Sequence, residues 1–319
     1  MNQKIYKMNS MPVIYLSICI PTNGRIEIVK NTLDSIYLNC EVDYSEFEVI
    51  LSDNSKTDEL LQLLDSYKKY PNIVYSKTTS QGFLNSANAL KLGNGLFLKL
   101  HNNYSIFNPG SLHKMISVIK ALQDQRPLVF FTNGHLKRND NQSFNSFNSF
   151  SNALSYWNSW STGFSIWKSD FDENCEKELS NMFPQTSLLL FNSKKSLFVI
   201  NDEIFFTNQE VPKKGGYNLF QTFCVDYLSL MNLAKENNII SLQTFNKIKK
   251  DLFYNYLVVA YYNTKIKKNE LTFELNNIKK SLSFYYLKSQ YYLLVFLSYN
   301  LAFKLSIRRL FVLLRIIKD

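Results

Sequence analysis

The sequence predicts an α/β fold: a mainly parallel sheet followed by a helical extension at the C-terminal end. Short apolar runs alternate with segments of helical spacing over the first hundred residues, and from Leu219 onward the pattern is almost wholly helical. The runs are continuously apolar, as in parallel strands covered on both faces. With 319 residues, 45% of them hydrophobic, the chain can bury a substantial core. Only 9 glycines and 7 prolines argue against a disordered or fibrous protein.

The first predicted strand is an apolar run over residues 14–20 that ends at Pro21. Three more strands are expected at residues 47–51, 73–75 and 96–100, separated by helices at 27–38, 57–67 and 86–92. In such sheets ligands bind at the carboxyl ends of the strands. The residues directly after each strand are therefore the candidate site.

The pattern changes at about residue 116. We expect strands at residues 128–132 and 161–168, a helix and a strand at 187–191 and 197–200, and a surface loop over the low-complexity residues 139–152. These changes divide the chain into three parts, residues 1–115, residues 116–240 and a basic, aromatic extension over residues 241–319.

Four scattered cysteines without a CxxC pair indicate reduced thiols and a cytoplasmic setting. Residues 1–11 are polar, which predicts no secretory signal. The longest uncharged stretch near the C-terminal end, residues 289–303, has 15 residues, whereas a spanning helix needs about 20 apolar ones.

The positive charge is concentrated in the last quarter of the chain. Residues 1–240 carry 22 basic and 22 acidic residues, whereas residues 241–319 carry 14 basic and 4 acidic residues. A helix over residues 303–318 would gather its cations on one stripe, mostly opposite its apolar side chains. The cations are Lys304, Arg308, Arg315 and Lys318; the apolar residues are Phe303, Ile307, Leu310, Leu314 and Ile317. This pattern favours an anionic membrane surface as partner over nucleic acid, the alternative being a helix packed on the body.

Motifs follow the predicted strands in a fixed order. They are LSICIPTNGR at 16–25, VILSDNSKTD at 49–58, Gly82 with Asn85, GLFL at 95–98 and FNPGSL at 107–112. Together they resemble the motifs of glycosyltransferase family 2. Their SDNS and NPGSL sequences are most similar to those of its abequosyltransferase-like branch. The resemblance covers residues 14–116 and implies a GT-A fold, a Rossmann-like nucleotide-binding sheet.

The resemblance also implies a nucleotide-sugar site. Thr22 and Asp53 would contact the base, and Asn23 and Arg25 would lie along the nucleotide. Pro21, Asn54, Gly82 and Asn85 complete the implied set. The alternative for Asp53 and Asn54 is an Asx turn before the following helix, with Ser55 or Thr57 as the N-cap of that helix.

The family places an acidic DxD-type motif after the fourth strand to hold a divalent metal. Here the slot contains His101, Asn102, Asn103 and Tyr104, without a carboxylate. Mn²⁺ and Mg²⁺ prefer charged oxygen ligands, so metal dependence is in doubt. Three interpretations stay open: cations neutralise the diphosphate, a metal binds weakly through Asn103 and His101, or the protein is a non-catalytic relative. The candidate cations are Arg25, Lys99, Lys213 and Lys214.

Transfer with inversion requires a general base. Residues 161–170 resemble the acceptor-side strand of relatives, so the carboxylates behind it are the candidates: Asp170, Asp172 and Glu173. These residues could equally cap and solvate the next helix. Trp157, Trp160 and Trp167 could stack on sugars or belong to the core.

We therefore expect a hexosyltransferase-type enzyme that moves a sugar from a nucleotide donor to a growing, lipid-linked bacterial surface glycan. Capsule or lipopolysaccharide O-antigen synthesis would suit it, as would peripheral attachment to the inner face of the cytoplasmic membrane. The alternative is a catalytically degenerate scaffold in a glycan assembly complex. The sequence has no GxxxxGK phosphate loop, no GxSxG elbow and no zinc-like spacing of His101, His113 and His135.

Overall fold

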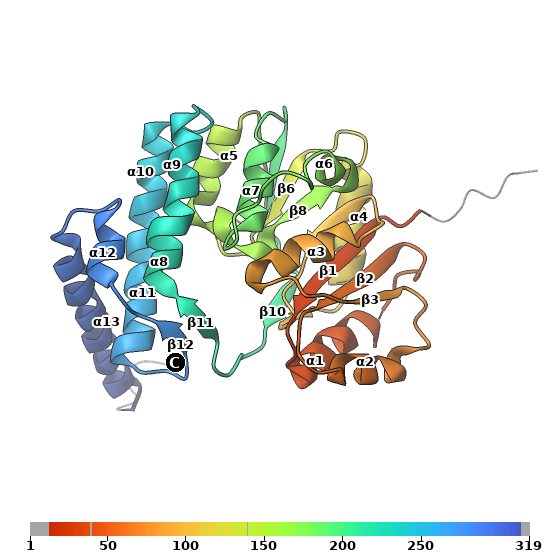
Figure 1. Cartoon of the computed structure of the whole chain (residues 1–319), viewed down its shortest axis with the longest axis horizontal. Coiled ribbons are helices and arrows are strands. Elements are labelled where there is room, and N and C mark those ends of the chain that lie inside the picture. The colour runs from red at the N-terminus through yellow and green to blue at the C-terminus, as the bar shows by residue number, and fades with distance from the viewer. Residues whose placement is uncertain (1–12, 39, 139, 314–319) are drawn as a thin grey trace, which may run out of the picture.

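The computed structural model describes residues 13–38, 40–138 and 140–313 (Figure 1). Its central sheet has five strands in the order β3-β2-β1-β4-β8. β1, β2, β3 and β4 are parallel, and β8 pairs antiparallel with β4. The strands are β1 (Leu16–Thr22), β2 (Phe47–Asp53), β3 (Ile73–Lys77), β4 (Phe97–Leu100) and β8 (Ser165–Trp167). The predicted mainly parallel sheet is confirmed.

Alternate residues of β1 face opposite cores, as strand geometry requires. Ile18 and Ile20 pack in the cluster that contains α1 (Ile26–Tyr37) and α4 (Ser111–Leu122). Cys19 packs in the other cluster with α3 (Asn85–Lys91). The sheet is thus buried on both faces, which explains the continuous apolar runs. The remaining helices of this half are α2 (Glu59–Leu63), η1 (Leu64–Tyr67) and η2 (Gly82–Leu84).

A second sheet in the order β6-β9-β7 stands beside the first. It consists of β6 (Leu128–Phe131), β9 (Phe198–Asn201) and β7 (Asn141–Phe144). The predicted surface loop at residues 139–152 is wrong, because this segment forms β7 and the start of α5 (Phe147–Leu154). Residue 139 itself lies outside the described part. The spacing of the FNSF repeat places Phe147 and Phe150 on one helical face, and Ser146 caps the helix by accepting from Ser149 N–H. Phe150 is fully buried against Phe198, with ring centroids 5.3 Å apart.

The segment between α5 and β9 carries short helical elements around β8. They are η3 (Ser155–Ser159), η4 (Ser161–Gly163), α6 (Lys168–Asp172) and α7 (Pro184–Phe191). The predicted strand at 161–168 is therefore partly a 3-10 turn, and only its second half pairs with β4.

The helical extension lies beside the α/β part, at the blue end of the chain in Figure 1. It comprises α8 (Leu219–Gln221), η5 (Thr222–Tyr227), α9 (Leu228–Glu236), α10 (Leu242–Asp251), η6 (Leu252–Leu257), α11 (Val258–Tyr261), η7 (Tyr262–Ile266), α12 (Ile278–Ser283) and α13 (Gln290–Leu313). One hydrophobic cluster runs from Cys19 to Leu294 and joins this extension to the sheet. Among the described residues no helix combines the length and apolarity that crossing a membrane demands.

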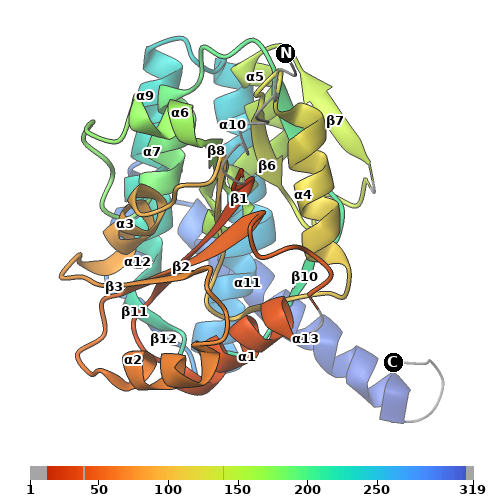
Figure 2. The ribbon, with the colours of Figure 1, turned by 90° about the vertical axis from the view of Figure 1, so that its right-hand side faces the viewer.

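Two small sheets connect the parts. β5 (Ser105–Phe107) pairs antiparallel with β10 (Phe206–Asn208), and β11 (Gly215–Asn218) pairs parallel with β12 (Thr272–Glu274). β12 interrupts the helical pattern that the sequence predicts beyond Leu219. Helix α13 projects from the body towards the C-terminal end (Figure 2). The predicted helix over 303–318 is part of α13 as far as Leu313; Leu314, Arg315, Ile317 and Lys318 lie outside the described residues.

Candidate functional site

The carboxyl ends of the parallel strands meet at one edge, as predicted. Thr22 at the end of β1 lies in register with Asp53 at the end of β2, and Asp53 with Lys77 at the end of β3. The loop after β1 turns through Gly24 at φ 107° and Arg25 at φ 63° before α1 begins. Asn23 and Arg25 are both exposed there and free to meet a ligand.

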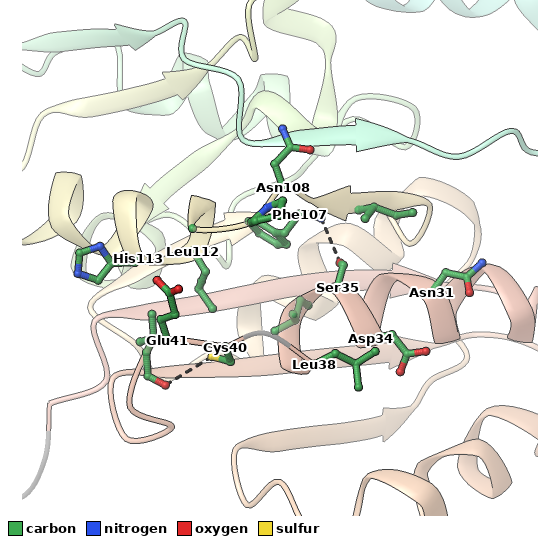
Figure 3. A pocket seen from close by; sticks show the side chains of 15 residues that line it. Asn31, Asp34, Ser35, Leu38, Cys40, Glu41, Phe107, Asn108, Leu112 and His113 are labelled. Carbon is green, nitrogen blue, oxygen red and sulfur yellow. Dashed lines mark hydrogen bonds between the residues drawn. The ribbon is translucent and has the colours of Figure 1, made fainter.

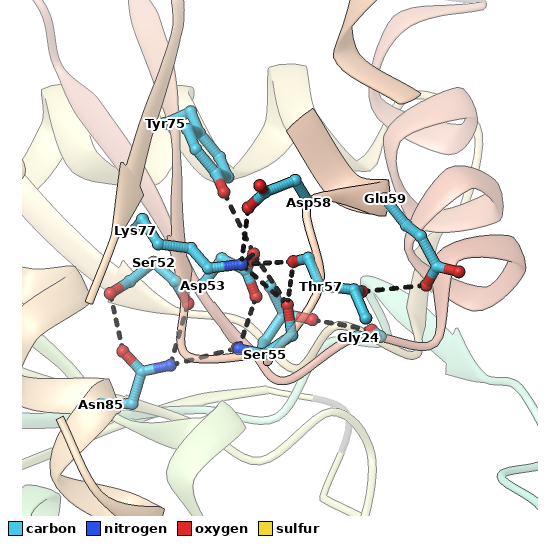
Figure 4. Close-up of polar contacts among 11 residues, drawn as sticks. Gly24, Ser52, Asp53, Ser55, Thr57, Asp58, Glu59, Tyr75, Lys77 and Asn85 are labelled. Atoms are coloured by element: carbon cyan, nitrogen blue, oxygen red, sulfur yellow. Dashed lines mark hydrogen bonds and ion pairs between the residues drawn. The ribbon is translucent and has the colours of Figure 1, made fainter. Parts of the chain in front are cut away.

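Asp53 is fully buried and organises the loop (Figure 4). One oxygen accepts Ser55 N–H at 2.9 Å; the other accepts Ser55 Oγ at 3.0 Å, Tyr75 OH at 3.1 Å and Lys77 Nζ at 3.1 Å. Burial opposes ionisation, but the hydrogen bonds from Ser55, Lys77 and Tyr75 outweigh it, so the pKa of Asp53 lies below its usual range. Both oxygens face protein donors. The Asx turn is thus present, but the helix-cap part of that interpretation is wrong, because α2 has Asp58 at its N-cap and no side-chain cap hydrogen bond. A direct base contact would have to displace one of the donors to Asp53.

Asn85 is a structural clamp. Its amide accepts Ser52 Oγ at 2.6 Å and donates to Ser52 O at 2.8 Å and Thr22 O at 3.3 Å. These bonds tie α3 to the ends of β1 and β2. Asn54 donates to Ser80 O at 2.9 Å, while its buried Oδ1 has no hydrogen-bond partner.

The side chains in the slot after β4 form hydrogen bonds and ring contacts with other residues of the protein. His101 is buried, donates Nε2–H to Ser105 O at 2.8 Å and stacks on Phe107 with ring centroids 4.5 Å apart. Burial, together with the charge of Lys99, lowers the pKa of His101 to about 3, so the ring is neutral. Asn103 Nδ2 donates to Thr22 Oγ1 at 3.0 Å.

The other two slot residues form a chain of hydrogen bonds towards a lysine. Ser161 Oγ donates to Asn102 Oδ1 at 3.2 Å, and Asn102 Nδ2 donates to Tyr104 OH at 2.8 Å. Lys214 Nζ donates to the same phenol at 3.1 Å and lies 4.6 Å from the centroid of the Tyr104 ring. An ammonium group from a distant segment thus reaches the position of the missing acidic motif.

The four candidate cations differ in position. Lys214 and Arg25 are exposed at the carboxyl edge, and Lys213 is exposed next to Lys214. Lys99 is not available to a ligand, because it is fully buried and donates to Leu100 O at 2.8 Å and to Thr162 O. Desolvation lowers the pKa of Lys99 to about 7. Lys99 was a wrong candidate for the diphosphate, because the side-chain alternation of β4 turns it into the core.

The slot residues do not fit a divalent metal. The amide oxygen of Asn102 already accepts Ser161 Oγ, and the Lys214 ammonium on the Tyr104 phenol would repel Mn²⁺ or Mg²⁺. Over the described ranges there is no cluster of three or more His, Cys, Asp or Glu that could bind a metal.

The candidate bases Asp170, Asp172 and Glu173 are not at this edge. β8 is antiparallel to β4, with Trp167 opposite Phe97, so the residues after β8 lie at the amino end of the parallel strands. Asp170 is paired with Lys195 at 2.5 Å and Asp172 with Lys168 at 2.5 Å. We correct the assignment, because strand direction separates these carboxylates from Asp53 and Tyr104.

The three tryptophans divide between core and surface. Trp167 is core, since it is 2% exposed and donates to Pro127 O at 2.7 Å. Trp157 and Trp160 are half-buried, and their ring centroids lie 5.7 Å apart. Trp160 precedes Ser161, whose hydroxyl donates to Asn102 in the slot.

Sequence reasoning missed several partners at this edge. Lys77 and Tyr75, which hold Asp53, stand in the third strand, and their position at its end was the available signal. Asp202 was also missed: it is buried and accepts Thr132 Oγ1 at 2.5 Å and Arg138 N–H at 2.7 Å, which shapes the loop after β6.

A hollow of about 420 Å³ lies along the C-terminal half of α1 beside the start of α4 (Figure 3). Asn31, Ser35, Phe107 and His113 are among its lining residues. No residue of the predicted nucleotide site or of the slot after β4 lines this hollow, so it is separate from the predicted donor site.

Comparison with known proteins agrees with this geometry. Residues 17–173, which contain the central sheet except for Leu16, match the family model described as "Glycosyl transferase family 2". No curated protein shows significant sequence similarity to the chain.

Solved structures extend the likeness beyond the matched region. S. aureus TarS 1-349 is similar with a TM-score of 0.57 and 15% identity, over 80% of this chain and 76% of that one. The same protein in complex with UDP-GlcNAc has a TM-score of 0.55 at 15% identity, over 79% and 76% of the two chains.

The mannosyltransferase PcManGT from Pyrobaculum calidifontis, in complex with GDP-Man and Mn²⁺, has a TM-score of 0.51 and 13% identity over 73% of this chain and 68% of that one. At these identities the likeness establishes the fold. The chain therefore has the GT-A glycosyltransferase fold, and its residues 17–173 match glycosyl transferase family 2.

Proposed function

We propose that the protein is a nucleotide-sugar-dependent glycosyltransferase of the hexosyltransferase type. The donor binds at the carboxyl edge, with its nucleotide along Pro21, Asn23, Arg25 and the turn at Gly82. Asp53 acts here as a positioning residue, because it fixes Lys77 and the Ser55 turn. The UDP-GlcNAc complex of TarS and the GDP-Man complex of PcManGT support a donor of this class.

The observation that carries the proposal is Lys214 on Tyr104. A leaving nucleoside diphosphate develops negative charge, which an enzyme must stabilise with a metal or with cationic donors. Lys214 supplies a cation where the family has acidic metal ligands, and Arg25 stands exposed at the start of α1, whose N-terminal dipole also favours anions. We therefore propose transfer without a bound metal.

The measurement is a thermal shift with UDP-, CDP-, GDP- and dTDP-sugars, each with Mn²⁺ and with EDTA, followed by donor turnover. A donor at 100 times its Kd stabilises by about 2.7 kcal/mol. We expect a shift with one nucleotide class that survives EDTA, and Lys214→Met to lower turnover by about 10²-fold or more. Lys213→Met is the matched control and should retain turnover. Among the described residues, it is the Lys214 side chain, and not that of Lys213, that bonds to the Tyr104 phenol.

A shift that requires Mn²⁺ would refute the metal-free proposal. Absence of a shift with every donor would favour the alternative, a catalytically degenerate scaffold in a glycan assembly complex. The lack of a slot carboxylate is the observation in favour of that alternative.

For the acceptor we propose a growing bacterial surface glycan, such as a capsule or lipopolysaccharide O-antigen, in line with the resemblance to abequosyltransferase-like proteins. A lipid-linked acceptor would place the enzyme on the inner face of the cytoplasmic membrane.

Helix α13 supports membrane association. Its side chains Leu294 and Ser298 are fully buried, while aromatic residues on the opposite side are 60–66% exposed. They are Tyr292, Phe296, Tyr299 and Phe303. Lys304, Arg308 and Arg309 are exposed further along the helix. Exposed aromatic residues next to cations suit the headgroup zone of an anionic membrane.

The membrane part is tested by flotation with vesicles of anionic or neutral phospholipid. We expect salt-sensitive binding to anionic vesicles only, and loss of binding in a Phe296→Ser, Phe303→Ser variant. Leu61→Ser, at a 50% exposed position of α2, is the control. Equal binding to neutral vesicles, or retention on DNA instead, would contradict the proposal.

A further inference from the structure

A second hollow, of about 570 Å³, lies between the loop after β6, the junction of α5 with η3, and the end of α10. It is separate from every residue assigned above to the donor. Its lining includes His135, Arg138, Trp157, Lys247 and Asp251.

One wall of this hollow is aromatic. The His135 ring stacks on Trp157 with centroids 4.4 Å apart, and Tyr156 stacks on the same indole at 5.2 Å. Trp160 meets His135 edge-on at 5.1 Å. His135 is exposed, and Tyr156, Trp157 and Trp160 are half-buried. Aromatic rings placed in this way present an apolar body and a polar rim, which suits the C–H face and hydroxyl edge of a sugar ring.

The opposite wall is cationic. Lys137, Arg138 and Lys247 line the hollow, and Asp251 is the only carboxylate in its lining. Asp251 is already paired, since it accepts Lys247 Nζ at 2.8 Å and Ser155 Oγ at 2.7 Å. The lining thus has a surplus of two positive charges. The side chain of Arg138 is exposed and bonds to Gln142, so its guanidinium can turn to a bidentate anion.

The backbone of this floor is held in an unusual conformation. Ser155 is buried, yet its backbone has φ 53° and ψ −137°, a region that glycine normally occupies. Segment η6, which follows α10 and contributes Asn255 to the lining, is π-helical. Such strain and π-turns are maintained where packing or function demands them.

The hollow adjoins the slot after β4. β6 is antiparallel to β8 and hence parallel to β4, so His135, just past β6, stands at the carboxyl edge. From Trp157 the contacts run through Trp160 to its neighbour Ser161, whose hydroxyl donates to Asn102. Asn102 in turn holds Tyr104, the residue under Lys214.

We propose that this hollow binds an anionic saccharide, a sugar ring that carries a phosphate or a carboxylate, with the ring against the aromatic wall of His135, Tyr156 and Trp157 and the anion at Arg138. In the context of the proposed function, on which this identification as a subsite rests, the saccharide is the acceptor. A neutral glycan would leave the surplus charge of Arg138 and Lys137 unused.

The test is calorimetric titration of the full chain with four probes: glucose 6-phosphate, trigalacturonate, maltotriose and tripolyphosphate. We expect glucose 6-phosphate or trigalacturonate to bind, and the one that binds identifies the anion. Arg138→Gln should weaken that binding at least tenfold, and so should Trp157→Leu. Lys68→Gln, on the exposed surface of the sheet domain, should leave it unchanged.

Three results would overturn the inference. They are equal affinity for maltotriose, tight binding of tripolyphosphate that Trp157→Leu does not affect, and no binding of either anionic sugar. The donor thermal shift keeps the two proposals apart, because Arg138→Gln should retain the wild-type shift. Saccharide binding without any donor shift would uphold this inference and remove the proposed function, and the reverse result would do the opposite.

Discussion

Asn85 offers the sharpest test of how the nucleotide edge is built. The side chain is 2% exposed and makes three hydrogen bonds, two of them short, to Ser52 Oγ at 2.6 Å and Ser52 O at 2.8 Å. The third, to Thr22 O, is 3.3 Å long. A buried hydrogen bond contributes about 0.5–1.5 kcal/mol net, and an orphaned partner costs about 1–3 kcal/mol. Asn85→Ala should therefore lower the free energy of unfolding by about 2–4 kcal/mol.

The assay is urea unfolding, read as a lower midpoint at an unchanged m-value. Asn88→Ala is the matched control, because Asn88 is half-buried and makes one bond, 2.7 Å to Ser52 Oγ. It should cost about 1 kcal/mol. The donor-induced thermal shift should also shrink in Asn85→Ala, since the ends of β1 and β2 lose their common tie.

Asn85→Asp gives the result that could refute this reasoning. A carboxylate can still accept from Ser52 Oγ, but it faces the carbonyl oxygens of Ser52 and Thr22, to which the amide donated. It should be at least as destabilising as Asn85→Ala at pH 7. An Asn85→Asp protein as stable as wild type, or an Asn85→Ala variant milder than Asn88→Ala, would show that the clamp does not exist.

Three further predictions concern buried groups around the site. The pKa of His101 is lowered to about 3, so its ring stays neutral in the folded protein but becomes protonated in the unfolded chain below about pH 6.5. The free energy of unfolding should therefore fall as the pH drops from about 6.5 towards 3, by at most about 1.4 kcal/mol per pH unit. His101→Gln should reduce this slope, measured as urea midpoints at each pH. The pKa of Lys99 is lowered to about 7, so above pH 7 the unfolded chain binds more protons than the folded protein does. The free energy of unfolding should therefore rise from about pH 7 to 8.5. A Lys99→Met variant with the same rise would contradict this prediction. Gly163→Ala should lower the thermal midpoint by an amount equivalent to about 1–3 kcal/mol, because a Cβ there would overlap the Phe130 ring and come within 2.9 Å of Phe131 O; an unchanged midpoint would mean that β6 can move away.

The order of motifs decided much of the nucleotide half. A continuously apolar run such as 14–20 is stable only when buried on both faces, so the parallel sheet followed from local pattern alone. The same argument placed Thr22, Asp53 and the slot at His101 on one edge, because parallel strands end together.

Short repeats were less informative. The segment at 139–152 has the composition of a loop, and its helix forms because Phe147 and Phe150 find buried partners on β9. Composition carries no information on those distant partners.

Three features were decided by tertiary structure alone. The direction of β8, which moves Asp170 to the far edge, depends on a pairing with β4 that no local pattern encodes. Lys214 meets Tyr104 across 110 positions of sequence, and His135 meets Trp157 through the packing of separate elements. Local sequence fixes which residues end a strand, whereas the side chains that meet beyond those ends depend on how distant segments pack.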